Sequence, residues 1–231
     1  LPVKPFLEEI ESAKNCDGIH ALLIKYAKIG LGQPFGAFFS ADDKNVTENI
    51  LQLYQGGLTL GQKDWYVNND DATRQIREAY KKHLVRMFKL YGFADDVAEK
   101  KAATVFRFET ELALVSKSNT ELRDPQANYN KMSLKEFEAN YPSLHLAELA
   151  KAMGVNENCI QEMNVGQPNF FNGLDKVLSL LTANDWKAIL EWDVINASAN
   201  ALSDDIREAN FDFFGRTMSG RKEDYPLWKR A

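Results

Sequence analysis

The sequence has little cysteine and no long apolar run. Only Cys16 and Cys159 occur among 231 residues, so a disulfide framework is not expected. We expect both thiols to be free, and a pair would form only if the fold brought them together. No apolar run approaches the roughly 20 residues that a membrane span needs. We therefore expect no transmembrane segment in this chain.

Basic charge is also scarce. The chain has 28 lysines and arginines against 33 aspartates and glutamates, which gives a net charge of −5. A nucleic-acid-binding protein would need a basic face, so nucleic acid is not an expected partner. Hydrophobic residues make up 45% and charged residues 26%, which is a globular composition. The length suits one or two domains with a real core.

The common catalytic and metal-binding motifs are missing. The three histidines are His20, His83 and His145, and no two are four residues apart. There is no His-Glu-x-x-His, no Cys-x-x-Cys, no glycine-rich phosphate loop and no Gly-x-Ser-x-Gly elbow. The sequence therefore predicts no catalytic residue, no metal ligand and no cofactor bound by this chain.

Apolar residues at helical spacing dominate what is present. Two short helices are expected within 6–29, with a turn at Asp17-Gly18. Further helices are expected at 70–91, 95–116, 134–139, 145–153, 170–181, 185–202 and 203–219, and another begins after Pro226. The helix at 185–202 is apolar on more than one face, which predicts a place in the middle of a bundle.

Two local signals mark helix starts. Ser133-x-x-Glu136 and Thr182-x-x-Asp185 have the pattern of a capping box, in which the hydroxyl takes a backbone N–H and the carboxylate reaches back. The first box predicts the helix at 134–139, and the second can cap the helix expected at 185–202.

One β-hairpin is expected near residues 35–55. FGAFFSA and NILQLYQ are strand-like runs separated by the polar turn residues 42–45. The segment 154–167 is expected to be a loop. The predicted fold class is mainly α, with a helical bundle and one small hairpin.

Glu109 is the one carboxylate on an otherwise apolar helix stripe. A buried carboxylate needs a partner or takes a raised pKa. Arg123, in the loop beyond the helix, is the candidate partner, so we expect a structural ion pair that holds the loop. The alternative is a general base beside a cavity, which would make the chain a hydrolase of its own.

Several segments together resemble the neprilysin/endothelin-converting-enzyme family of zinc metallopeptidases. They occur in that family's order and extend over nearly the whole chain. They are LTLGQKDWY (58–66), FETELA (108–113), LRDPQANYNKMSLKEFE (122–138) and FFGRTMSGRKEDYPLWKR (213–230).

This resemblance implies that residues 1–231 are the N-terminal helical cap region, excised from a longer chain. In such enzymes the cap lies over a thermolysin-like catalytic domain, and the two enclose a cavity that limits substrates to peptides. The zinc of the parent enzyme would be bound by that domain, which is absent here. A separated cap should also expose apolar surface on the hairpin or on a helix face.

One departure from the family implies a bacterial member. Asn68, Arg77 and Ala231 stand where animal members place cysteines, which resembles bacterial oligopeptidase O. The expected compartment is the bacterial cell envelope or the exterior, with the cytoplasm left open. The alternative to a peptidase cap is a helical protein-interaction module with no enzymatic parent.

Overall fold

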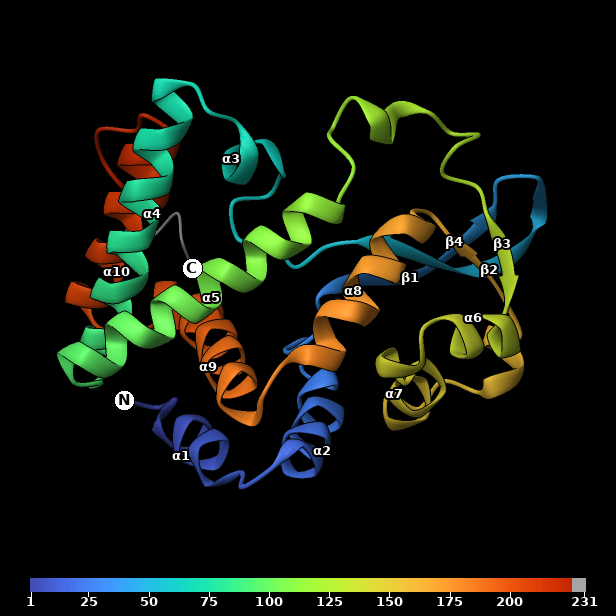
Figure 1. The fold of residues 1–231 in the computed structure, drawn as a ribbon, viewed down its shortest axis with the longest axis horizontal. Coiled ribbons are helices and arrows are strands. Elements are labelled where there is room, and N and C mark those ends of the chain that lie inside the picture. Colours follow the sequence, from blue (N-terminus) through green and yellow to red (C-terminus); the bar gives the residue numbers. More distant parts are fainter. Residues whose placement is uncertain (226–231) are drawn as a thin grey trace.

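The computed structural model describes residues 1–225 and confirms a mainly helical fold (Figure 1). The helices are α1 (Lys4–Ser12), α2 (Cys16–Ala27), α3 (Asp64–Val67), α4 (Asp71–Leu90), α5 (Asp95–Val115), α6 (Leu134–Asn140), α7 (Leu146–Ala152), α8 (Pro168–Leu180), α9 (Ala183–Ser198) and α10 (Asp204–Asn210). The strands are β1 (Phe35–Asp42), β2 (Asn45–Gln55), β3 (Lys131–Ser133) and β4 (Glu162–Val165). The helix expected after Pro226 lies outside the described residues.

The helix boundaries follow the local signals in the sequence. The Asp70 side chain accepts the backbone N–H of Thr73 at 2.9 Å, so α4 begins where the pattern predicts. The capping boxes at Ser133 and Thr182 are both formed. The last long helix differs, because α10 continues into a π-helical stretch, Phe211–Met218.

The turn between the first two helices was predicted in the wrong place. Asp17 and Gly18 lie in the first turn of α2, because the Asn15 side chain accepts the Gly18 N–H at 3.0 Å and caps that helix. The turn is formed by the residues between Ser12 and Cys16.

The hairpin is confirmed, but it belongs to a four-stranded sheet. β1 and β2 pair antiparallel, and the order across the sheet is β1-β2-β4-β3. β4 runs parallel to β2 and places Met163 and Val165 in the core. The segment expected to be a loop at 154–167 therefore contains a strand. β3 and β4 are too short to show a period of two in the sequence.

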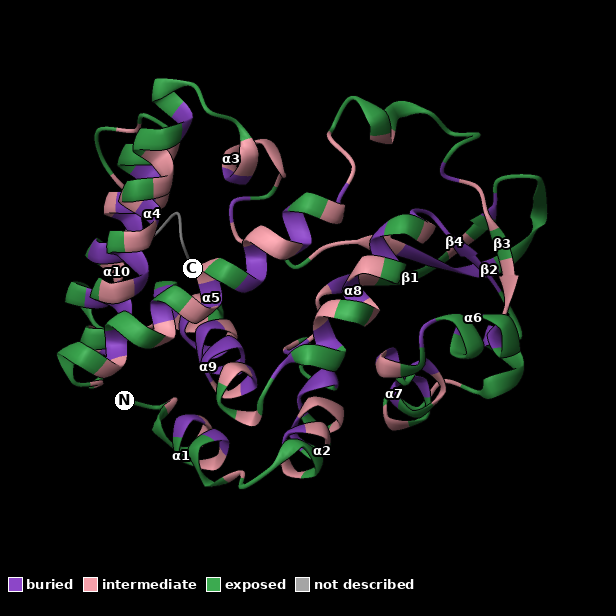
Figure 2. Cartoon of the chain, viewed as in Figure 1, coloured by how far each residue is buried: buried purple, intermediate pink, exposed green. Residues whose placement is uncertain are grey.

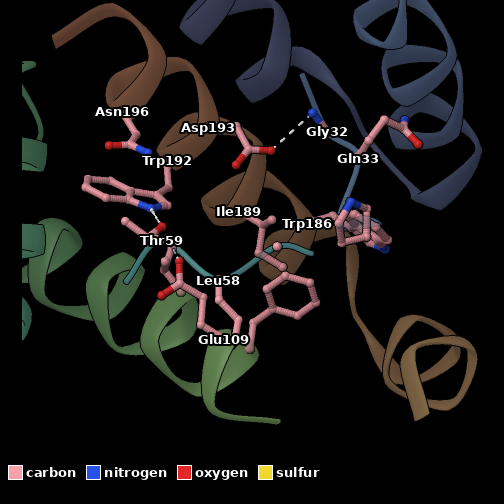
Figure 3. A pocket seen from close by; sticks show the side chains of 14 residues that line it. Gly32, Gln33, Leu58, Thr59, Glu109, Trp186, Ile189, Trp192, Asp193 and Asn196 are labelled. Atoms are coloured by element: carbon pink, nitrogen blue, oxygen red, sulfur yellow. Dashed lines mark hydrogen bonds between the residues drawn. The ribbon is translucent and has the colours of Figure 1, made fainter. Parts of the chain in front are cut away.

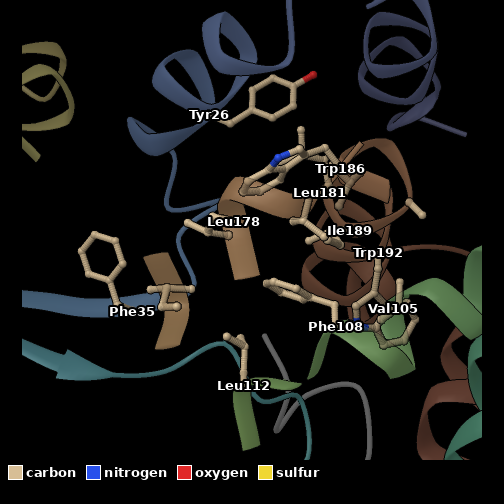
Figure 4. Packing of buried hydrophobic residues seen from close by; sticks show 14 of the residues in the cluster. Tyr26, Phe35, Val105, Phe108, Leu112, Leu178, Leu181, Trp186, Ile189 and Trp192 are labelled. Atoms are coloured by element: carbon tan, nitrogen blue, oxygen red, sulfur yellow. The ribbon is translucent and has the colours of Figure 1, made fainter. Parts of the chain in front are cut away.

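The helices and the sheet share one core. In Figure 1, α4, α5, α9 and α10 form the helical side, while the sheet with α6 and α7 lies on the other side and α8 lies between them. Figure 2 shows α9 buried along much of its length, as its apolar faces predict. Figure 4 shows the centre of this core, where Trp186, Ile189 and Trp192 of α9 lie near Val105 and Phe108 of α5.

The hairpin carries exposed apolar side chains. Phe38 is 51% exposed, Phe39 46% and Val46 79%. Together with Met153 and Val155 beyond α7, Phe38 and Phe39 line an apolar groove of about 450 Å³. No helix among residues 1–225 is both long enough and apolar enough to cross a membrane.

Gly173 allows α8 to pack closely on the end of α5. A Cβ at this position would lie 2.5 Å from Cγ1 of Val115. Gly173→Ala is therefore expected to lower the free energy of unfolding by about 1–3 kcal/mol, and urea unfolding measures this change. In the Val115→Gly background, which removes the Val115 Cβ and both methyl groups, the same substitution is expected to cost much less, because the three nearest clashing atoms are gone.

Gly18→Ala is the matched control for Gly173→Ala. It also lies in a helix, but its Cβ would meet Ala13 and Asn15 no closer than 3.5 Å, which is ordinary contact. Equal losses at both glycines would contradict close packing at Gly173.

Candidate functional site: a cavity with two carboxyl groups

A cavity of about 220 Å³ lies between α5, α9 and two loop segments (Figure 3). It has room for several water molecules or a small polar group, but it is smaller than the sites that hold drug-sized ligands. Its lining residues are Gly32, Gln33, Pro34, Gly57, Leu58, Thr59, Val105, Phe108, Glu109, Trp186, Ile189, Trp192, Asp193 and Asn196.

Glu109 lies at the cavity wall and is held by hydroxyl groups. Oε1 accepts from Thr59 at 2.6 Å, and Oε2 accepts from Tyr66 at 2.7 Å. The Tyr80 hydroxyl lies 3.0 Å from Oε1 and 2.8 Å from Oε2. Trp192 Nε1 donates to the Thr59 hydroxyl at 3.0 Å, which fixes that donor in turn. The carboxyl group is therefore the common acceptor of a buried network.

Burial controls the protonation of Glu109. Loss of solvent is the largest influence and raises the pKa of Glu109 to about 7, although the hydrogen bonds from Thr59, Tyr66 and Tyr80 oppose it. The negative charge of Asp193 adds to the increase. Glu109 consequently changes its charge near neutral pH.

Asp193 on α9 is the second carboxyl group of the cavity. One oxygen accepts the backbone N–H of Gly32 at 3.1 Å, as the dashed line in Figure 3 shows. Burial raises the pKa of Asp193 to about 7. Asp193 was not among the site residues predicted from the sequence. The available signal was a carboxylate inside a helix that is apolar on more than one face.

The expected partner of Glu109 is not the one in the structure. Arg123 is exposed at the end of a short 3₁₀ turn, Glu121–Arg123. The ion pairs among residues 1–225 include none between Arg123 and Glu109. Tyrosine and threonine hydroxyls take the place of the guanidinium.

The loop after α5 is held by amide side chains instead. Asn164 of β4 accepts the Asn130 N–H at 2.7 Å and donates to the Asn128 carbonyl at 3.0 Å. Gln55 at the end of β2 accepts the Lys117 N–H at 2.8 Å and donates to its carbonyl at 2.9 Å. The loop is therefore pinned to the sheet, not to Glu109.

The cavity can hold or exchange protons at two carboxyl groups. A general base must reach the proton that it abstracts on a bound substrate. Both carboxyl oxygens of Glu109 already accept hydrogen bonds from hydroxyl groups of the protein. This arrangement favours a structural role for Glu109 at the cavity wall. Among residues 1–225, the one set of three possible metal ligands lies elsewhere, at the surface, and consists of His20, His145 and Glu148.

Comparison with known sequences gives a family for the whole chain. The family model described as "Peptidase family M13" matches residues 1–231. Neprilysin-3 of Drosophila melanogaster is 27% identical over 219 residues, which cover 91% of this chain and 28% of that protein. The neutral endopeptidase of Lactobacillus helveticus is 26% identical over 190 residues, which cover 82% of this chain and 29% of that protein.

Solved structures show the same fold. The zinc metalloprotease ZMP1 of Mycobacterium tuberculosis, in complex with an inhibitor, matches with a TM-score of 0.90 and 26% identity, over 99% of this chain and 35% of that chain. The chain spans a little over a quarter of the length of these curated relatives. The match over all 231 residues agrees with the resemblance found in the sequence, and the chain belongs to peptidase family M13.

Proposed function

We propose that residues 1–231 form the non-catalytic cap region of a zinc metalloendopeptidase that hydrolyses peptides. The observation that carries this proposal is the likeness to ZMP1, a zinc metalloprotease, over 99% of this chain but only 35% of that chain. The remaining part of such a protein would supply a thermolysin-like catalytic domain. The cap would form one wall of the substrate cavity and limit substrates to peptides.

The residues around Glu109 do not fit a catalytic zinc centre. Such a centre keeps three protein ligands and one open position for water, next to a general base. The sequence has no His-Glu-x-x-His, and Glu109 is bound by threonine and tyrosine hydroxyls, not by an imidazole group. We therefore assign the catalytic zinc to the part of the enzyme outside residues 1–231 and derive no step of catalysis from this chain.

The exposed hairpin fits a cap that meets another domain. Phe38, Phe39 and Val46 are each close to half exposed or more, and apolar patches of this kind mark interaction sites. Cys16 and Cys159 are both exposed and free. Asn68 and Arg77 in place of the animal cysteines support a bacterial member, and a place in the cell envelope or outside the cell is part of the proposal.

The proposal is tested by peptide cleavage with two forms of the protein. The 231-residue chain and a longer form with the downstream part of the gene are assayed on a quenched fluorescent peptide. The longer form is expected to cleave the peptide, to lose activity with a zinc chelator and to regain it with added Zn²⁺. The 231-residue chain is expected to be inactive under all three conditions.

The same experiment separates the alternatives. Zinc-dependent cleavage by the 231-residue chain would overturn the proposal and favour a hydrolase that uses Glu109. A downstream sequence without His-Glu-x-x-His would favour a protein-interaction module. The family match over the whole chain does not favour that module.

A further inference from the structure

Three metal-ligand side chains meet at the surface between α2 and α7. His20 lies on α2, His145 is the residue before α7, and Glu148 lies in the first turn of α7. One ligand atom from each lies within 4.8 Å of the other two. The closest pair is His20 Nε2 and Glu148 Oε2, at 2.9 Å. Residues separated by 128 positions in the chain thus form one cluster.

His145 adopts an unusual backbone conformation to join the cluster. Its φ of 47° and ψ of 44° lie in the left-handed region, and no other non-glycine residue in the described part of the chain has a positive φ. Asparagine and glycine take this conformation at less cost. The imidazole lies against the ring of His20, with 4.5 Å between the centroids. Backbone strain at a residue with a chemically active side chain is typical of functional positions.

The donor set suits a borderline divalent metal ion. Imidazole nitrogen and carboxylate oxygen bind Zn²⁺ at about 2.0–2.2 Å, whereas Mg²⁺ and Ca²⁺ prefer oxygen alone. Donor atoms around a tetrahedral ion at that distance are about 3.3 Å apart. The distance from His20 Nε2 to Glu148 Oε2 would need to increase slightly, and the His145 ring would need to move closer to both. Side chains at the surface can make such adjustments.

One further feature favours an ion at this point. A recess of about 40 Å³ next to the cluster has a mainly apolar lining that also includes His20, Ser143 and His145. This volume is enough for a water molecule, which would complete a four-coordinate ion.

We propose that His20, His145 and Glu148 form a binding site for a divalent transition metal ion of the Zn²⁺ class. The ion would join α2 to α7 and so fasten the N-terminal helices to the segment beside the sheet. Metal binding would then stabilise the folded chain by an amount that grows with the logarithm of the free metal concentration above the Kd. The proposal does not depend on the parent being a peptidase.

The test is a metal titration of the untagged 231-residue chain. Cys16 and Cys159 are exposed thiols that bind Zn²⁺ themselves, so the titration uses a background with both replaced by serine. Zn²⁺ is added in competition with a chromophoric chelator, and Co²⁺ absorption reports the coordination number. We expect about one equivalent with a Kd of about 10 µM or tighter, a four-coordinate Co²⁺ spectrum and a higher Tm with Zn²⁺.

Variants locate the ion. His20→Gln, His145→Asn and Glu148→Gln are each expected to weaken Zn²⁺ binding at least about tenfold. Asparagine is chosen at position 145 because it tolerates the left-handed backbone, so the variant keeps its fold. Glu48→Gln, an exposed glutamate on β2, should bind Zn²⁺ like the background protein. A Kd weaker than about 100 µM, or binding that the three variants leave unchanged, would overturn the proposal.

Discussion

Glu109→Leu is expected to lower the free energy of unfolding by about 3–5 kcal/mol. The substitution removes the common acceptor of the Thr59, Tyr66 and Tyr80 hydroxyls. A buried polar group without a partner costs about 1–3 kcal/mol, and leucine offers no acceptor to any of the three. Urea unfolding at pH 5, followed by tryptophan fluorescence, measures the loss.

Glu109→Gln is the conservative control and gives the pH dependence. Glutamine still accepts hydrogen bonds, so it should cost much less than leucine at pH 5. The folded pKa of Glu109 is about 7, above its ordinary value of 4.5. Its contribution to stability is therefore fully present below pH 4.5 and is lost as the pH rises through 7.

The stability of the original chain relative to Glu109→Gln should fall by about 3 kcal/mol between pH 4.5 and pH 8, because one pKa unit corresponds to about 1.4 kcal/mol. Denaturant titrations of both proteins across this range measure the difference. Parallel stability curves would mean that Glu109 has no raised pKa in the folded protein. A loss in Glu109→Leu no larger than in Glu109→Gln would contradict the hydroxyl network.

Lys101→Met is expected to lower the free energy of unfolding by about 3–5 kcal/mol at pH 8, since it leaves a charge buried without its partner. Lys101 Nζ lies 2.6 Å from Oε2 of Glu191, whose side chain is 0% exposed, and 2.9 Å from Oε1 of Glu11. Neither oxygen of Glu191 has a hydrogen bond of good geometry among the described residues, so the pairing is mainly ionic.

The loss should be smaller at acid pH. Burial raises the pKa of Glu191 to about 7 even beside Lys101, so without the lysine this pKa rises further. Glu191 would then stay neutral at pH 5.5 and carry an uncompensated charge only at higher pH. Thermal unfolding of Lys101→Met at pH 5.5 and pH 8 checks this difference.

Lys100→Met is the matched control for Lys101→Met. Lys100 is the neighbouring lysine on α5, its side chain is 80% exposed, and its contact with Asp96 spans 3.6 Å. Exposed pairs contribute about 0–1 kcal/mol, so little change is expected. Lys101→Met with Glu191→Leu should recover most of the loss, because both charges are then gone. Equal losses for Lys100→Met and Lys101→Met would rule out a stabilising buried pair.

The helices could be predicted because their signals are local. The stripe in α4 and the capping boxes at Ser133 and Thr182 depend on residues three or four positions apart. The hairpin was predictable for the same reason, since its two strands are joined by a short polar turn. The other two strands, β3 and β4, are three and four residues long. They are strands only because they pair with distant segments, and no local sequence pattern predicts that pairing.

The candidate site could be predicted in part. The position of Glu109 on an apolar stripe predicted its burial, and the structure confirms it. Its partners could not be predicted, because Thr59 and Tyr66 come from the segment before α4 and Tyr80 from α4 itself. Arg123, in the loop beyond the helix, was the expected partner, yet that loop is pinned to the sheet and leaves Arg123 exposed.

The sequence by itself determined the mainly helical class, the main helix boundaries, the hairpin and the family. Each of these depends on short-range periodicity, on capping residues or on the order of motifs, and all three can be recognised from the sequence alone. Only the tertiary structure decided which side chains meet. It brought Asp193 to the cavity of Glu109 and joined His20 to His145 and Glu148. These clusters of side chains form because elements that are distant in the sequence pack together. The spacing of residues along the chain does not predict that packing.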